Sequence, residues 1–339
     1  MMNKKDVQLT YNVMDANKSF FYVILTNICA VLVFAVLMMA VGLLSIFGLP
    51  ESAYNFISSL FQVLLIPSLF LLIIIVYHRI KNINLKTATN FDWRVNPYIV
   101  GISVLILLVC ITCFFPIINM LYSLIALTGY EVSGAVAFEM NNWWQLLIGA
   151  VAYCALPAIA EEIIFRGMVL KGTLSKATPI VAITISSVAF FIMHGSLIQS
   201  FYQIVLGFLL GIIGYYTKNI LYPIIFHFLN NLSVVLISYF GIGGFLNGFA
   251  LTFGGFVAGI GLAILGAAII FALVLIIKLL MKKKNADYEF VVNDNNIIVE
   301  EKQEKQNLKQ FINSMSMDEK FYFYSAWCCA IIIWIFGSL

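Results

Sequence analysis

Nine long apolar runs, separated by short polar segments, extend along the 339 residues of the chain. A helix that crosses a hydrocarbon core of about 30 Å needs about 20 apolar residues, and every run reaches or approaches that length. The pattern therefore predicts an all-α polytopic membrane protein, with an eight-helix core and a short ninth C-terminal membrane segment. The runs lie at about residues 20–48, 55–77, 97–124, 143–163, 179–195, 200–217, 220–240, 256–281 and 321–337.

Polar stretches divide the chain into an arm, a membrane domain, a tether and a last segment. We expect the arm and the tether to lie in the cytosol. The last segment either spans the membrane or lies in its interface, because Phe, Tyr and Trp residues near its start are typical of the interface. The predicted bounds are 1–19 for the arm, 20–281 for the membrane domain with its motif core at 143–240, 282–320 for the tether and 321–339 for the last segment.

Composition and charge strengthen this interpretation. Hydrophobic residues make up 62% of the chain and charged residues only 10%, against about 25% charged residues in soluble domains. With the N-terminus inside, all 19 Lys and Arg residues fall in inner segments and none in outer connections. The positive-inside rule thus predicts a multi-pass protein of the cell membrane with a cytosolic N-terminus. We expect contact with the lipid bilayer and no nucleic-acid partner, and the pattern leaves the oligomeric state open.

Two adjacent carboxylates stand inside the fourth run, which otherwise carries no charge from Trp143 onward. They are Glu161 and Glu162, and Arg166 follows four residues after the second. An ionisable group within a spanning segment costs at least a few kcal/mol and marks a functional site by default. A structural alternative is an ion pair between Glu162 and Arg166 along one helix face at the membrane edge.

Two of the three histidines of the chain also lie within apolar runs. His194 closes the fifth run, and His227 is followed by Asn230 and Asn231, which are three and four residues further along and share its helix face. Glu161 and His194 lie equally far from the turn that joins their runs, about 22 Å at 1.5 Å per residue. We expect both glutamates, both histidines and Asn231 to converge in a polar pocket that opens to the inner side.

This set of side chains supports two kinds of hydrolytic chemistry. A poorly solvated carboxylate is suited to act as a general base toward water, and an imidazole with an amide can donate hydrogen bonds to an oxyanion. Alternatively, Glu161, His194 and His227 could bind a divalent metal such as zinc, which would acidify a bound water. The spacing does not choose between them, so no cofactor is certain and zinc remains a candidate.

Three motifs resemble those of one family. Glu161-Glu162-Ile163-Ile164-Phe165-Arg166-Gly167 matches the EExxFRG motif of the CPBP family of intramembrane proteases, which comprises type II CAAX prenyl endopeptidases and Abi bacteriocin-processing and self-immunity proteins. Phe190 to His194 matches its FxxxH motif, and His227 to Asn231 matches HxxxN. The resemblance implies that Glu161 and His194 activate a water, and that His227 and Asn231 stabilise the oxyanion. Glu162 and Arg166 would support them.

The sequence therefore favours an intramembrane glutamate- or metal-dependent endopeptidase of the CAAX-protease type. Its substrate would be a peptide or a membrane-associated protein, cleaved from the cytosolic side. The Asn-, Ile- and Lys-rich tail favours a bacterial source, in which such proteins resemble peptide-processing or self-immunity members. One alternative is a non-proteolytic membrane scaffold that regulates a partner protein. Another is a proton-coupled transporter, since Glu and His also form proton relays, although the chain lacks the internal repeats of transporters.

Overall fold

The computed structural model describes residues 10–46, 48, 50–129, 140, 142–242, 252–286 and 305–337. Across these ranges 86% of the residues are helical and no strand is formed. Among the described residues, eight helices are long and apolar enough to cross a membrane, and a shorter apolar helix corresponds to the fifth predicted run. The predicted all-α polytopic fold is confirmed. The first nine residues of the arm and residues 287–304 of the tether lie outside the described residues.

The helices follow the predicted runs, with several of the longer ones divided into α and π segments. In chain order they are α1 (Val13–Ile46), α2 (Glu51–Lys81), α3 (Leu85–Thr89), α4 (Pro97–Val109), η1 (Cys110–Phe114), α5 (Phe115–Ala126), α6 (Trp143–Gly149), η2 (Ala150–Ala155), α7 (Leu156–Glu162), η3 (Ile163–Leu170), α8 (Lys171–Leu174), α9 (Pro179–Met193), α10 (Leu197–Thr217), α11 (Leu221–Tyr239), α12 (Phe253–Ala286), α13 (Leu308–Ser314) and α14 (Met317–Gly337).

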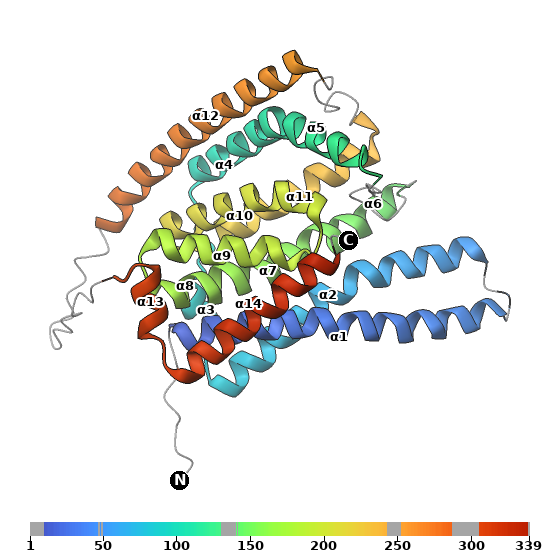
Figure 1. Ribbon diagram of the computed structural model, residues 1–339, viewed down its shortest axis with the longest axis horizontal. Coiled ribbons are helices and arrows are strands. Elements are labelled where there is room, and N and C mark those ends of the chain that lie inside the picture. Colours follow the sequence, from blue (N-terminus) through green and yellow to red (C-terminus); the bar gives the residue numbers. More distant parts are fainter. Residues whose placement is uncertain are drawn as a thin grey trace, which may run out of the picture.

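The helices carrying the three motifs lie in the middle of the bundle (Figure 1). There α9 packs between η3 and α10, and α11 packs against α10, α7 and η2. On one side α12 covers α4 and α5, and on the other α1 pairs with α2 in a long hairpin (Figure 1). The ninth predicted run forms α14, which packs against α1 and α9. The surrounding helices thus enclose the motif helices from several sides.

Prolines explain two of the π segments. Pro116 and Pro157 each occupy the second position of an α segment that follows a π segment, and in both cases the residue before the proline donates its N–H to the carbonyl five residues back. A proline has no N–H for the usual acceptor four residues back, and a wider turn keeps the helix continuous. The third π segment, η3, begins directly after Glu162. Such segments are rare and are found frequently at functional sites.

The first helix begins earlier than its apolar run, and its polar start is buried. Asn12 and Asp15 cap it reciprocally, each accepting a hydrogen bond of 3.0 Å from the other's backbone N–H. The Tyr77 hydroxyl donates to the Asp15 carboxylate at 2.7 Å. Asn17 donates to the Glu319 carbonyl of α14 at 3.0 Å. Part of the sequence assigned to a cytosolic arm therefore packs inside the bundle, since its polar groups find partners there.

Candidate functional site

A buried ion network joins the EExxFRG and HxxxN motifs. The Glu162 Oε1 atom accepts hydrogen bonds from Arg166 Nη1 and His227 Nδ1, both at 2.9 Å. Arg166 Nη2 donates to the carbonyl of Gly207 on α10, also at 2.9 Å. Glu162 and Arg166 are almost completely buried. The intrahelical ion pair between Glu162 and Arg166 that the sequence suggested is present. The same two side chains also bond to Gly207 of α10 and His227 of α11, and so connect these helices to the segment that carries the EExxFRG motif.

Glu161 has a different environment from its neighbour. Successive residues of a helix point about 100° apart, and Glu161 is still 8% exposed whereas Glu162 is 0% exposed. Among the described residues, Glu161 Oε2 is buried without a hydrogen-bond partner. The carboxylate nevertheless lies within electrostatic range of His227 and Arg166. Within the described residues, Glu162 Oε2 is also without a partner, but that carboxylate is fully buried and ion-paired through Oε1. Of the two glutamates, Glu161 is therefore the more available to a water or a substrate.

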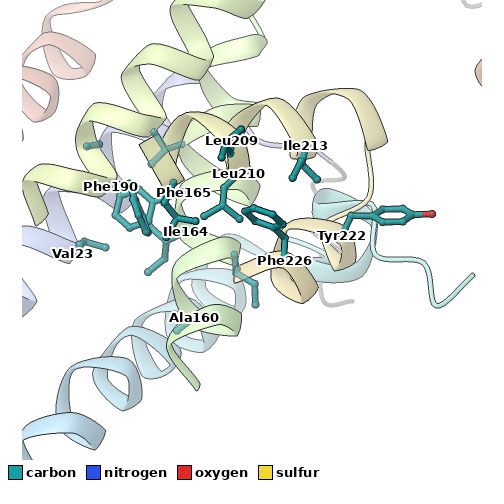
Figure 2. Close-up of a cluster of buried hydrophobic side chains, with 14 of the residues drawn as sticks. Val23, Ala160, Ile164, Phe165, Phe190, Leu209, Leu210, Ile213, Tyr222 and Phe226 are labelled. Atoms are coloured by element: carbon teal, nitrogen blue, oxygen red, sulfur yellow. The ribbon is translucent and has the colours of Figure 1, made fainter. Parts of the chain in front are cut away.

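The side chain of Phe190 brings the two histidines and the arginine together. Its ring centroid lies 4.9 Å from that of His194 and 5.7 Å from that of His227. The Arg166 guanidinium lies over the ring at 4.5 Å from the centroid, a favourable cation–π arrangement. Figure 2 shows the Phe190 ring beside Phe165 in the buried cluster. The aromatic residue of the FxxxH motif thus acts as a packing centre for the charged groups.

His194 lies at the end of its helix rather than within it. Helix α9 ends at Met193, and Gly195 turns the chain with a φ of 58°, a value that favours glycine. The Nδ1 atom of His194 is 2.8 Å from the Phe190 carbonyl oxygen. A carbonyl only accepts, so Nδ1 carries the proton and a neutral ring leaves the Nε2 lone pair free. The 15 residues of α9 span about 22 Å, which is shorter than the hydrocarbon core.

A chain of hydrogen bonds orients Asn231. The Tyr202 hydroxyl donates to Asn230 Oδ1, and Asn230 Nδ2 donates to Asn231 Oδ1 at 3.1 Å. Asn231 Nδ2 in turn donates to the Tyr153 carbonyl at 3.2 Å. Pro157, four residues after Tyr153, has no N–H to donate to that carbonyl. An amide nitrogen carries two hydrogens, so Asn231 can still donate one to a substrate.

Tyr202 belongs to none of the three motifs, and the sequence analysis missed it. Its ring packs on Phe115 with the centroids 5.0 Å apart, while its hydroxyl reaches Asn230. The sequence did contain one signal for it, namely a tyrosine within an apolar helix. A buried tyrosine hydroxyl usually finds a hydrogen-bond partner, so such a residue indicates a polar contact inside the bundle. Its partner, Asn230, becomes evident only from the packing of α10 on α11, so the sequence alone did not assign it.

Hydrogen bonds join some of the predicted residues into two groups, and Glu161 and His194 belong to neither group. Glu162, Arg166 and His227 are joined directly, and the asparagines form the second group. Within the described residues, Glu161 and His194 share no hydrogen bond. Nor does any group of three or more His, Cys, Asp or Glu side chains in that part of the chain lie suitably to hold a metal ion. The predicted zinc set of Glu161, His194 and His227 is therefore not assembled as a ligand cluster.

The fold and the site define a multi-pass helical membrane protein with ionisable groups gathered inside its bundle, which is typical of a functional site. A protein-family model described as type II CAAX prenyl endopeptidase Rce1-like matches residues 142–233. This segment contains all three motifs and confirms the resemblance that they carry. It supports an intramembrane CAAX-protease-type function in general. Comparisons with curated proteins and with solved structures each found no significant match.

Proposed function

We propose that the protein is an intramembrane endopeptidase in which Glu161 and His194 activate a water molecule. The observation that carries this proposal is the contrast between the two adjacent glutamates. Among the described residues, Glu162 Oε1 pairs with both Arg166 and His227, and only its Oε2 lacks a partner. Glu161, in contrast, forms no ion pair in that part of the chain, and its Oε2 is also without a partner. A general base must be free to take a proton from its substrate. Glu161, which is 8% exposed and not held in an ion pair, suits this role better than Glu162, which is 0% exposed and paired with two basic side chains.

His194 has the protonation that such a role needs. Its Nδ1–H is held by the Phe190 carbonyl, which leaves Nε2 to accept a hydrogen bond from the same water. Fixing one imidazole nitrogen in this way sets the tautomer and the direction of the ring. The water would then lose a proton to the Glu161 carboxylate while its oxygen bonds to the carbonyl carbon of the scissile peptide.

His227 and Asn231 are suited to stabilise the oxyanion that this attack creates. The Glu162 carboxylate holds His227 through Nδ1, so Nε2 can donate when the ring is protonated. Asn231 has a second amide hydrogen to donate, and preorganised donors of this kind stabilise a developing negative charge. The protonated Glu161 then gives its proton to the leaving amine as the carbon–nitrogen bond breaks, which restores the carboxylate.

The charges of the cluster support this sequence of steps. The proposed steps require a protonated His227, and in that state two carboxylates are balanced by two cations, which suits a poorly solvated site. When Glu161 takes the proton of the water, one positive charge remains uncompensated within the cluster. The oxyanion that forms in the same step neutralises it. The resting site and the reacting site are thus both close to electrical neutrality.

The substrate that fits this site is a peptide or a membrane-associated protein whose cleavable bond reaches the buried cluster. We propose that it enters from the cytosolic side, on the orientation that the positive-inside rule gives. The description of the matching family model names prenyl endopeptidases. A prenylated C-terminal peptide is therefore the first substrate class to compare with unmodified peptides.

Cleavage of quenched peptides by the purified protein tests the proposal. Farnesylated and unmodified peptides would be compared for the wild type, Glu161→Ala and His194→Ala. Exposed Glu51, at the start of α2, provides a matched control as Glu51→Ala. We expect turnover by the wild type and the control, and none by the two site variants. If the wild type cleaves nothing but every variant binds one cellular partner, a scaffold function replaces this proposal.

A further inference from the structure

The C-terminal part of the chain contacts the helix of His194 at its beginning. Just before α9, the Gln306 N–H donates to the Lys176 carbonyl and the Thr178 N–H donates to the Gln306 carbonyl, both at 2.9 Å. These bonds form a short parallel bridge between Ala177 and Gln306. The side chain of Phe311, from α13, is buried beside Ala177. The described end of the polar tether is therefore docked on the turn from which α9 starts.

The last helix reaches the other end of α9. Trp334 Nε1 donates to Ser200 Oγ at 2.7 Å, and Ser200 Oγ donates to the Ser196 carbonyl at 2.6 Å. Ser196 is the N-cap of α10 and follows His194 by two residues. The Trp334 indole of α14 is thus connected, through the Ser200 hydroxyl, to the turn that directly follows the FxxxH motif.

A close backbone contact adds to this hydrogen bond. A Cβ atom placed on Gly337 would lie 2.1 Å from the carbonyl oxygen of Gly195, a distance that no real contact allows. Ile333 Cγ2 lies 3.8 Å from the Cβ position of Gly195. Gly195 is the residue next to His194, so the end of α14 lies directly on the residue that follows His194.

The middle of α14 is built for close packing. Ala326 and Ala330 are completely buried, and α14 packs on both α1 and α9. Small residues at a helix contact let two backbones approach closely in a membrane. Residues 305–337 lie outside the segment matched by the family model, which ends at residue 233. The segment therefore reaches the candidate site from another part of the sequence.

We propose that residues 305–337 form a positioning element that holds His194 in place from both ends of α9. Trp334 is its principal positioning residue. The catalytic consequence of this inference rests on the proposed function, whereas the consequence for the environment of His194 does not. In this proposal, residues 305–337 contribute to the geometry of the candidate site and do not serve only as an additional membrane anchor.

Full-chain variants separate positioning from general stability. Trp334→Phe keeps the ring but removes the N–H donor, and Gly337→Ala places a methyl group against the Gly195 carbonyl. The matched controls are Trp327→Phe, whose indole packs on Phe20 of α1, and Gly254→Ala, which has open space around it. Peptide turnover and the midpoint of thermal unfolding would be measured for all four.

We expect Trp334→Phe and Gly337→Ala to lower kcat about tenfold, since small displacements of a catalytic group reduce rates strongly. KM should stay close to that of the wild type in both variants. The unfolding midpoint should stay close to that of the wild type in Trp334→Phe, whereas the backbone contact in Gly337→Ala should lower it. Both controls should keep full turnover. Unchanged kcat in Trp334→Phe would overturn the proposal. An equal loss in Trp327→Phe would also overturn it, by showing that α14 acts only through overall stability.

A second measurement does not depend on proteolysis. Diethyl pyrocarbonate modifies accessible imidazoles, and mass spectrometry reports the rate at His194 separately from the buried His78 and His227. Losing the Trp334 hydrogen bond should make modification of His194 about fivefold faster, with no change in Trp327→Phe. Equal rates in the wild type and Trp334→Phe would contradict the positioning role even if no peptide were ever cleaved.

Discussion

Replacing each of the two adjacent glutamates by glutamine should change a different property of the protein, stability in one case and turnover in the other. Glu162→Gln removes the carboxylate that Arg166 and His227 share, and it leaves a guanidinium that is only 1% exposed without its ion-pair partner. Glu161→Gln removes no ion pair among the described residues. We therefore expect Glu162→Gln to lower stability and Glu161→Gln to lower turnover.

The size of the stability effect follows from burial. Removing one member of a buried ion pair costs about 3–5 kcal/mol, and the glutamine oxygen still accepts a neutral hydrogen bond that contributes about 1 kcal/mol. The free energy of unfolding should therefore fall by about 2–4 kcal/mol in Glu162→Gln. In Glu161→Gln the change should stay below about 1 kcal/mol, as for substitutions that break no buried interaction.

Unfolding by SDS in mixed micelles, followed by far-ultraviolet circular dichroism, measures both values. Arg166→Gln and the double variant Glu162→Gln/Arg166→Gln complete a thermodynamic cycle. The double variant should lose less than the sum of the single losses, with a coupling energy of about 1–3 kcal/mol. Equal destabilisation by Glu161→Gln and Glu162→Gln would refute the assignment of different tasks to the two carboxylates, and additive losses would refute the ion pair.

Three further predictions concern other parts of the structure. Tyr202→Phe removes the donor to Asn230 and should lower kcat about fivefold without changing the circular dichroism spectrum. In Gly172→Ala, the new Cβ atom would lie 2.4 Å from the Asn12 carbonyl oxygen. We expect it to lower the free energy of unfolding by about 1–3 kcal/mol, as measured in the SDS assay. The control Gly101→Ala has open space around it and should leave the stability unchanged. Because the predicted zinc set is not assembled, 1,10-phenanthroline should leave peptide turnover unchanged, and a loss that zinc restores would contradict this.

The sequence predicted the apolar helices and the motif residues because both depend on local patterns. Apolar length marks a spanning helix regardless of its neighbours, and ionisable residues stand out in such a run. Motif spacing also indicated that Glu162 and Arg166 could pair along one helix face, as they do. Pro116 and Pro157 carried a local signal for irregular turns that the sequence interpretation did not use, and π segments precede both.

Features that depend on contacts between distant segments could not be predicted in the same way. Asp15 and Asn17 have the polarity of a solvated arm, but they are buried because Tyr77 and the Glu319 carbonyl provide hydrogen-bond partners. The hydrogen bond between Trp334 and Ser200 joins residues 134 positions apart, and no periodicity marks such a pair. The positions of residues around His194 thus depend on the packing of α14, which the sequence pattern leaves open.

The central claim is that Glu161 is the base that activates water for peptide hydrolysis. The most direct measurement is the turnover of a cleaved peptide by the wild type and by Glu161→Gln, with the reaction run in H₂¹⁸O so that the new carboxylate reports the attacking water. The account predicts ¹⁸O in the wild-type product and a loss of about 10²–10⁴ in kcat for Glu161→Gln, with an unchanged unfolding free energy. If Glu161→Gln cleaved the peptide at the wild-type rate under conditions in which His194→Ala is inactive, the claim that Glu161 is the base would be contradicted.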